Sequence, residues 1–130
     1  MPEKVSQKLE TLFSILVLIT ILEIAHYTVI SSDLAYIVNK SFAFGNFGTN
    51  ILAIVVSLIL IVTILIYVKR RYISPLALIF VMSGAITNII DRLIHGGSID
   101  YIHLLTIPIF NAPDVLIVAG LSIFFFEVAT

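Results

Sequence analysis

The residues best suited to do chemistry gather in one segment, residues 84–114, which reads GAITNIIDRLIHGGSIDYIHLLTIPIFNAPD. Three of the eight acidic residues and two of the three histidines fall here, although the chain as a whole is 60% hydrophobic. Ionisable groups at membrane depth are costly and are usually functional. The polar side chains that need an explanation are Asn88, Asp91, Arg92, His95, Asp100, His103, Asn111 and Asp114.

Asp100 and Asp114 are the strongest candidates for a catalytic pair. Asp114 follows Pro113, a residue suited to the first position of a helix, so it should lie in a first turn where the helix dipole favours an anion. Asp100 has the apolar neighbour Ile99 and the aromatic neighbour Tyr101, a setting in which a carboxyl holds its proton more readily. Two carboxyls that share one proton can activate water and protonate a leaving amine. Alternatively, each Asp merely caps a helix or faces water at the headgroups.

Other chemistries fit the segment less well. His95, Asp100 and His103 could hold a metal ion, but their spacing matches no known signature, and the chain has neither an HExxH motif nor a cysteine. We therefore expect no metal and no organic cofactor. Asp91 and Arg92 could anchor a helix at the membrane interface, or Arg92 could offer its planar donor fork to a substrate carbonyl or phosphate.

The elements that must position these residues are membrane helices. The chain has 130 residues, only 12% of them charged, and a mean hydropathy of +1.17, so lipid rather than water is its expected solvent. The net charge of -1 gives no signal for nucleic acid. Apolar runs of about 20 residues are long enough to cross a bilayer. We predict an all-α membrane protein, one domain over residues 1–130, with spans at about 12–30, 51–68, 75–93 and 112–128.

Basic residues predict the orientation of these spans. Five lie on one side of the predicted layout and two on the other, which places both termini in the cytoplasm. Residues 31–50, with short strand character at 35–38, and the loop at 94–111 then face outward. The candidate pair would lie at that outer surface. The two sets are Lys4, Lys8, Lys69, Arg70 and Arg71 against Lys40 and Arg92.

The 84–114 segment resembles the signature of bacterial lipoprotein signal peptidase, signal peptidase II. That family shows G-A, then N-x-x-D-R-x-x-x-G, a V-x-D-F-like segment, and F-N-x-A-D at the start of its last helix. Upstream, residues 39–45 (NKSFAFG) resemble the family's N-x-G-A-A-F loop. The residues at matching spacings are Gly84, Ala85, Asn88, Asp91, Arg92, Gly96, Asp100, Phe110, Asn111 and Asp114.

The resemblance implies an intramembrane aspartyl endopeptidase of the cytoplasmic (inner) membrane, with its active site at the extracytoplasmic surface. Such an enzyme removes signal peptides from prolipoproteins at a diacylglyceryl-modified cysteine. It implies a monomer among membrane lipids, without cofactor, and a small β-cradle formed by residues 31–50. Carried over by position, the roles are catalysis by Asp100 and Asp114, substrate contact by Asn39, Arg92 and Asn111, site support by Asn88 and Glu23, and a structural role for Asp91.

The chain departs from the family pattern in its first helix. Where D-x-x-x-K is usual, it has Glu23 and Tyr27, so the cation is missing unless His26 substitutes for it. Two readings from other classes remain open, a small polytopic transport or binding protein that relays protons or ions, and an inactive relative acting as a scaffold. The further departures are Ser41 for Gly, Tyr101 for Phe and Pro113 for Ala.

Overall fold

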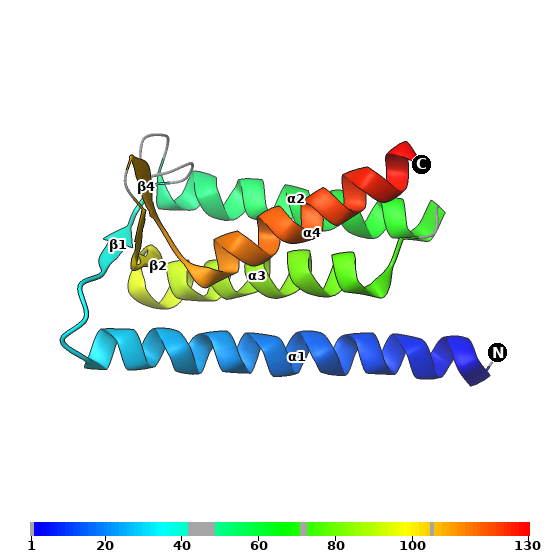
Figure 1. Ribbon diagram of the computed structural model, residues 1–130, viewed down its shortest axis with the longest axis horizontal. Helices are drawn as coiled ribbons and strands as arrows, with labels where there is room; N and C mark the ends of the chain where they lie inside the picture. The colour runs from blue at the N-terminus through cyan, green and yellow to red at the C-terminus, as the bar shows by residue number, and fades with distance from the viewer. Residues whose placement is uncertain (1, 42–48, 71–72, 105) are drawn as a thin grey trace.

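The computed structural model describes residues 2–41, 49–70, 73–104 and 106–130. Within these ranges the chain forms four long helices and four short strands (Figure 1). The order is α1 (Pro2–Ser31), β1 (Ile37–Asn39), α2 (Asn50–Arg70), α3 (Pro75–His95), β2 (Ser98–Asp100), β3 (Ile102–Leu104), β4 (Ile107–Phe110) and α4 (Ala112–Ala129).

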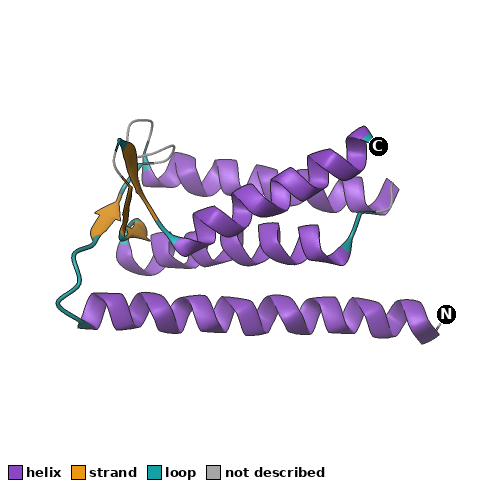
Figure 2. Cartoon of the chain, in the orientation of Figure 1, coloured by secondary structure: helices purple, strands orange, loops and turns teal. Residues whose placement is uncertain are grey.

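Each of these four helices is long and apolar enough to cross a membrane. Their outward faces carry large exposed hydrophobic side chains, an arrangement that water disfavours and a hydrocarbon solvent accepts. The prediction of an all-α membrane protein is thus confirmed in its fold class. Both termini lie at one end of the bundle, and the strands lie at the opposite end (Figures 1 and 2).

The first helix begins earlier than the apolar run suggests. A span was expected at about 12–30, whereas α1 starts at Pro2 and ends at Ser31. Residues 2–11 are polar but include the good helix formers Glu, Lys, Gln and Leu. The polar residues at this point therefore do not mark the end of the helix.

Helix α3 is the centre of the bundle and contacts α1, α2 and α4. Ser74 caps its N-terminus by accepting the N–H of Ala77, Pro75 fills the first turn, and Gly96 ends it in the left-handed conformation with φ 79°. Gly84 allows α3 and α4 to approach each other closely. A Cβ at Gly84 would collide with the backbone oxygen of Pro113 in α4.

The strands connect the two loops at one end of the bundle, because β1 in the first loop pairs with β2 in the second. β1 pairs antiparallel with β2, with Ile37 opposite Asp100 and Asn39 opposite Ser98, and β3 pairs antiparallel with β4. The expectation of a plain loop at 94–111 is therefore wrong, because β2, β3 and β4 all lie within it. The β-cradle is shared between both loops instead of being built by residues 31–50. Residues 42–48, most of the N-x-G-A-A-F-like stretch, lie outside the described part of the chain.

Candidate active site

Asp100 ends strand β2 and is almost completely buried, at 2% exposure. Its Oδ2 accepts a hydrogen bond from Asn39 Nδ2 at 3.0 Å. Its Oδ1 accepts from Ser98 Oγ at 3.1 Å and from Asn111 Nδ2 at 2.9 Å. The pairing of β1 with β2 explains why Asn39 is near, since the two loops meet in register there.

Asp114 lies in the first turn of α4, as predicted from Pro113. Asn111 is the N-cap: its Oδ1 accepts the N–H of Asp114 at 2.8 Å, and the Asp114 carboxylate accepts the N–H of Asn111 at 3.2 Å. This reciprocal pair is a capping box, in which each side chain satisfies one otherwise unpaired backbone donor. The Asp114 carboxylate therefore has a fixed orientation at the positive end of the helix dipole.

An amide pair joins the two acids. Asn111 Nδ2 donates to both Asp100 Oδ1 and Asn88 Oδ1, at 2.9 and 3.0 Å, and Asn88 Nδ2 donates to Asp114 Oδ1 at 3.0 Å. Asp100 and Asp114 also line one cavity of about 200 Å³. The other residues lining that cavity are Asn39, Arg92, Ser98, Ile109, Ile117 and Val118.

Arg92 lines the same cavity but uses its donors on the protein itself. Its Nη1 donates to the backbone oxygen of Asn39 at 3.1 Å and to Asn50 Oδ1 at 3.0 Å, and its Nη2 donates to the backbone oxygen of Ser41 at 2.7 Å. The planar guanidinium thereby ties α3 to the end of β1 and the start of α2. Asn39 in turn donates to Asp100, so Arg92 supports one of the two acids indirectly.

The surroundings of Asp100 make its carboxyl hold a proton more readily than a solvated aspartate does. Burial raises the pKa of its carboxyl to about 6, and the nearby charge of Asp114 acts in the same direction. Hydrogen bonds from Asn39 and Ser98 and the charge of Arg92 oppose that rise without cancelling it. Two acids placed this way can share one proton, as general acid–base catalysis of hydrolysis requires.

Asp91 belongs to a separate buried group, and Glu23 is half-buried. Asp91 Oδ2 lies 2.5 Å from Nδ1 of His26 on α1, and Nε2 of His26 lies 3.1 Å from the Tyr101 hydroxyl. Tyr27, at the position where the family has its cation, is 72% exposed, and it is the neighbouring His26 that contacts Asp91.

Sequence reasoning gave no role to Ser98, Tyr101 and Asn50, and it named His26 only as a possible substitute for the missing cation. Ser98 lies two positions before Asp100, a spacing that places both side chains on one face of a strand, and Tyr101 directly follows Asp100. Asn50 begins the second span, and His26 is an ionisable residue inside an apolar run. Of these residues, only His26 could have been identified from the sequence, because an ionisable residue inside a membrane span usually has a function.

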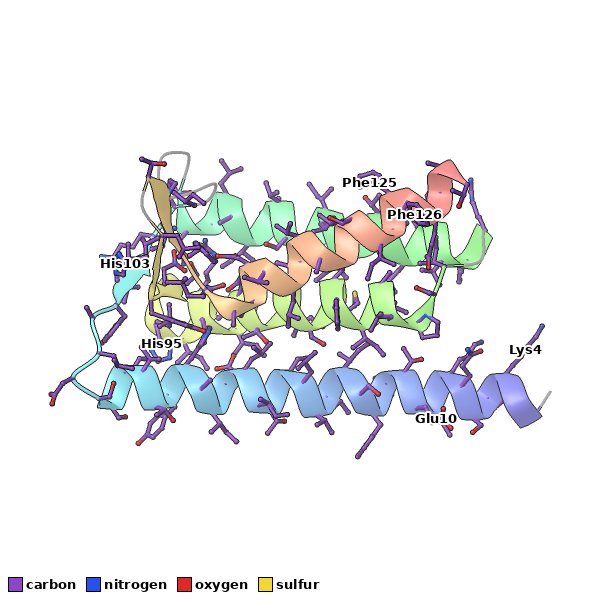
Figure 3. The ribbon with its side chains drawn as sticks, viewed as in Figure 1. Lys4, Glu10, His95, His103, Phe125 and Phe126 are labelled. Carbon is purple, nitrogen blue, oxygen red and sulfur yellow. The ribbon has the colours of Figure 1, made fainter. Side chains whose placement is uncertain are left out.

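The alternative metal site receives no support from the arrangement. His95 and His103 are exposed at the strand-bearing end of the molecule (Figure 3). Across residues 2–41, 49–70, 73–104 and 106–130, no three His, Cys, Asp or Glu side chains lie close enough to hold one ion.

Comparison with known proteins identifies the family. A family model described as signal peptidase (SPase) II matches residues 7–130. The lipoprotein signal peptidase of Clostridioides difficile is 32% identical over 132 residues, which cover 92% of this chain and 89% of that protein. Those of Moorella thermoacetica and Syntrophomonas wolfei are 35% and 37% identical, over 69% and 67% of this chain. The matched stretches span 63% and 61% of these two relatives, which is less than two thirds of their length.

Two solved structures of bacterial membrane enzymes share the fold. One superimposes with a TM-score of 0.80 at 15% identity, covering 92% of this chain and 87% of the other. The second gives 0.75 at 16% identity and covers 92% of each chain. With the family model matching nearly the whole length, the chain belongs to the signal peptidase II family.

Proposed function

We propose that this protein is an intramembrane aspartyl endopeptidase that removes signal peptides from prolipoproteins at the diacylglyceryl-modified cysteine. The observation that carries the proposal is the placement of Asp100 and Asp114 on one cavity, joined by the Asn111–Asn88 amide pair. The family membership supports the same reaction class. Asn39, Arg92 and Asn111 are proposed to orient the substrate, and Asn88 to support the dyad.

The hydrolysis follows from one proton shared by the pair. Asp114, ionised, takes a proton from water, whose oxygen adds to the scissile carbonyl carbon while Asp100 gives its proton to the carbonyl oxygen. The tetrahedral diol then collapses. Its C–N bond breaks, the leaving nitrogen takes the proton from Asp114, and a diol hydroxyl returns one to Asp100. One water is consumed, and both acids regain their starting states.

The surroundings of the dyad suit an apolar, lipid-bearing substrate. Asp114 and Val118 also line a second cavity of about 420 Å³, whose other walls are the apolar side chains of Ile107, Phe110 and their neighbours on α4. A signal-peptide side chain or an acyl chain of the modified cysteine could lie there while its peptide bond meets the acids. Lipid binding by this cavity, like the monomeric state, belongs to the proposal.

The membrane orientation is also proposed. Lys4 and Lys8 on α1 and Lys69 and Arg70 on α2 mark the end of the bundle opposite the strands, where Figure 3 shows Lys4. The positive-inside rule places that end, with both termini, in the cytoplasm. The dyad then opens at the extracytoplasmic surface of the inner membrane, where the headgroup of a lipid-modified substrate would lie.

Cleavage of a diacylglyceryl-modified model prolipoprotein by the purified protein in detergent tests the proposal. Asp100→Asn and Asp114→Asn should each abolish cleavage while the folded fraction stays unchanged, because an amide cannot carry the shared proton. Asp33→Asn, the same change at an exposed acid, should leave the rate unaltered. Full activity in either dyad variant removes that residue from the mechanism. An inactive wild-type protein that still binds the substrate would favour a scaffold role, and loss of activity to a chelator with recovery on adding zinc would favour a metal site.

A further inference from the structure

A buried hydrogen-bond chain links α1 to the backbone that carries both acids. His26 is 1% exposed and contacts Asp91 on α3 through Nδ1 and the Tyr101 hydroxyl through Nε2. The two rings meet edge to face, with centroids 5.3 Å apart. Nothing in the proposed hydrolysis uses these groups, although His26 and Asp91 are fully buried and Tyr101 is half-buried.

The Tyr101 hydroxyl reaches the start of α4. It accepts the backbone N–H of Ala112 at 3.2 Å, and the backbone N–H of Tyr101 donates to the oxygen of Phe110 at 2.9 Å. Tyr101 directly follows Asp100, and Ala112 lies two residues before Asp114. One side chain is thus attached to both segments that carry the acids.

Two of these hydrogen bonds have a direction that their partners fix. The Tyr101 hydroxyl oxygen accepts the backbone N–H of Ala112. The Asp91 carboxylate can only accept, so Nδ1 of His26 donates to it. Burial raises the pKa of Tyr101, so its phenol keeps its proton at neutral pH, and the hydroxyl shares one hydrogen bond with Nε2 of His26.

We propose that His26 and Tyr101 are positioning residues that fix the first turn of α4, and hence Asp114, relative to Asp100. The proposal rests on the proposed function, because it assigns a task in setting the geometry of that dyad. Asp91 is hydrogen-bonded to the His26 ring, the ring to the Tyr101 hydroxyl, and the hydroxyl to the backbone N–H of Ala112.

The first turn of α4 shows why this contact matters. A helix leaves its first backbone N–H groups without partners inside the helix. Here Asp114 N–H is taken by the Asn111 side chain and Val115 N–H by the Asn111 backbone oxygen, while Pro113 has none. Ala112 N–H depends on the Tyr101 hydroxyl. Its removal leaves a part-buried donor without its protein partner next to the dyad, and we expect this loss to displace the turn.

Two substitutions remove the link at different points. Tyr101→Phe deletes the hydroxyl but keeps the ring. His26→Asn keeps an N–H close to the position of Nδ1, so the contact with Asp91 can persist, but it removes the hydrogen-bond partner of the Tyr101 hydroxyl. Each change should lower kcat roughly tenfold to a hundredfold with KM little altered, since a displacement of about 1 Å costs this much at a reacting centre.

The double variant and a rescue separate positioning from general structural damage. If both residues act through one hydrogen-bonded path, Tyr101→Phe with His26→Asn should be no slower than the worse single variant. His26→Gln, whose longer amide can reach the Tyr101 hydroxyl, should recover part of the kcat lost in His26→Asn. Tyr27→Phe, the same change on the exposed face of α1, is the matched control and should behave as wild type.

Thermal denaturation of each variant in detergent gives its folded fraction, and kcat is expressed per folded molecule. Each outcome then supports or overturns one of the two proposals. Wild-type kcat in Tyr101→Phe, a loss confined to KM, or losses that multiply in the double variant would each overturn the positioning role. Cleavage that persists in Asp100→Asn would instead overturn the dyad. If Asp100→Asn is inactive and Tyr101→Phe is not, the proposed function stands and the positioning role fails.

Discussion

Gly84→Ala should damage catalysis although residue 84 touches no substrate. A Cβ at this position would lie too close to the backbone oxygen of Pro113 and 2.8 Å from the Cγ1 of Ile117. Pro113 directly precedes Asp114, so the collision falls on the turn that holds one of the two acids. A backbone oxygen cannot rotate away as a flexible side chain can, so the whole start of α4 must retreat from α3.

The size of the effect follows from the hydrogen bonds that this retreat stretches. Relieving the collision requires a shift of at least about 0.6 Å, which would lengthen the 3.0 Å bond from Asn88 to Asp114 to about 3.6 Å, beyond the usual range of such bonds. Overpacking of this kind costs about 1–3 kcal/mol of stability. Loss of alignment at the dyad should lower kcat roughly tenfold to a hundredfold.

Gly120→Ala is the matched control, because it places the same methyl group in the same α3–α4 interface away from the dyad. Its Cβ would lie 2.6 Å from Val81 Cγ2 and 3.0 Å from the Ala77 oxygen. Thermal denaturation should show that both variants are destabilised, and cleavage per folded molecule should fall only for Gly84→Ala. Equal kcat losses in the two variants, or a wild-type kcat in Gly84→Ala, would refute the idea that this contact sets the position of Asp114.

Two further predictions concern the charges of the site. Because the pKa of Asp100 is raised from 3.8 to about 6, the folded state binds the extra proton between about pH 4 and pH 6. Stability should therefore fall as pH rises through this window. The value of kcat/KM should fall with a midpoint near pH 6. If the melting temperature of Asp100→Asn depends on pH in the same way as that of the wild type, the prediction is wrong. Arg92→Lys keeps the charge but cannot span the oxygens of Asn39, Ser41 and Asn50, so it should cost about 1–3 kcal/mol in denaturation. Unchanged stability would mean that charge alone is what the site needs.

The helices and the site residues could be predicted from sequence for different reasons. Length and hydropathy alone indicate four spans, because a bilayer imposes both on any helix that crosses it. The position of Asp114 was predictable from local chemistry, since Asn111 and Pro113 specify a helix start. Only the resemblance to a family predicted that Asp100 lines the same cavity as Asp114. The spacing of two residues along the chain does not tell whether their side chains are close in the fold.

Strand character at 35–38 was predicted and overlaps β1, but the pairing of β1 with β2 and the His26 network could not be predicted in this way. β1 and β2 are three residues each and come from loops more than fifty positions apart, too short for an alternating pattern to show. The His26–Tyr101 contact spans 75 positions and depends on the packing of α1 against α3. The strand pairing and the His26–Tyr101 contact are both formed by the tertiary fold. A sequence pattern indicates only the local structure of residues that are close along the chain.

The choice of neutral donors around the acids explains how a buried pair can stay reactive. Asp100 receives its hydrogen bonds from Asn39, Ser98 and Asn111, and the dyad forms no ion pair within the described part of the chain. An arginine paired directly with Asp100 would stabilise the carboxylate and drive its proton away. Arg92 is near enough to act on Asp100 electrostatically, yet its donors are taken by other oxygens. Amides therefore orient the two carboxyls while leaving one proton for them to share, and replacing an amide by a cation should cost activity even where it adds stability.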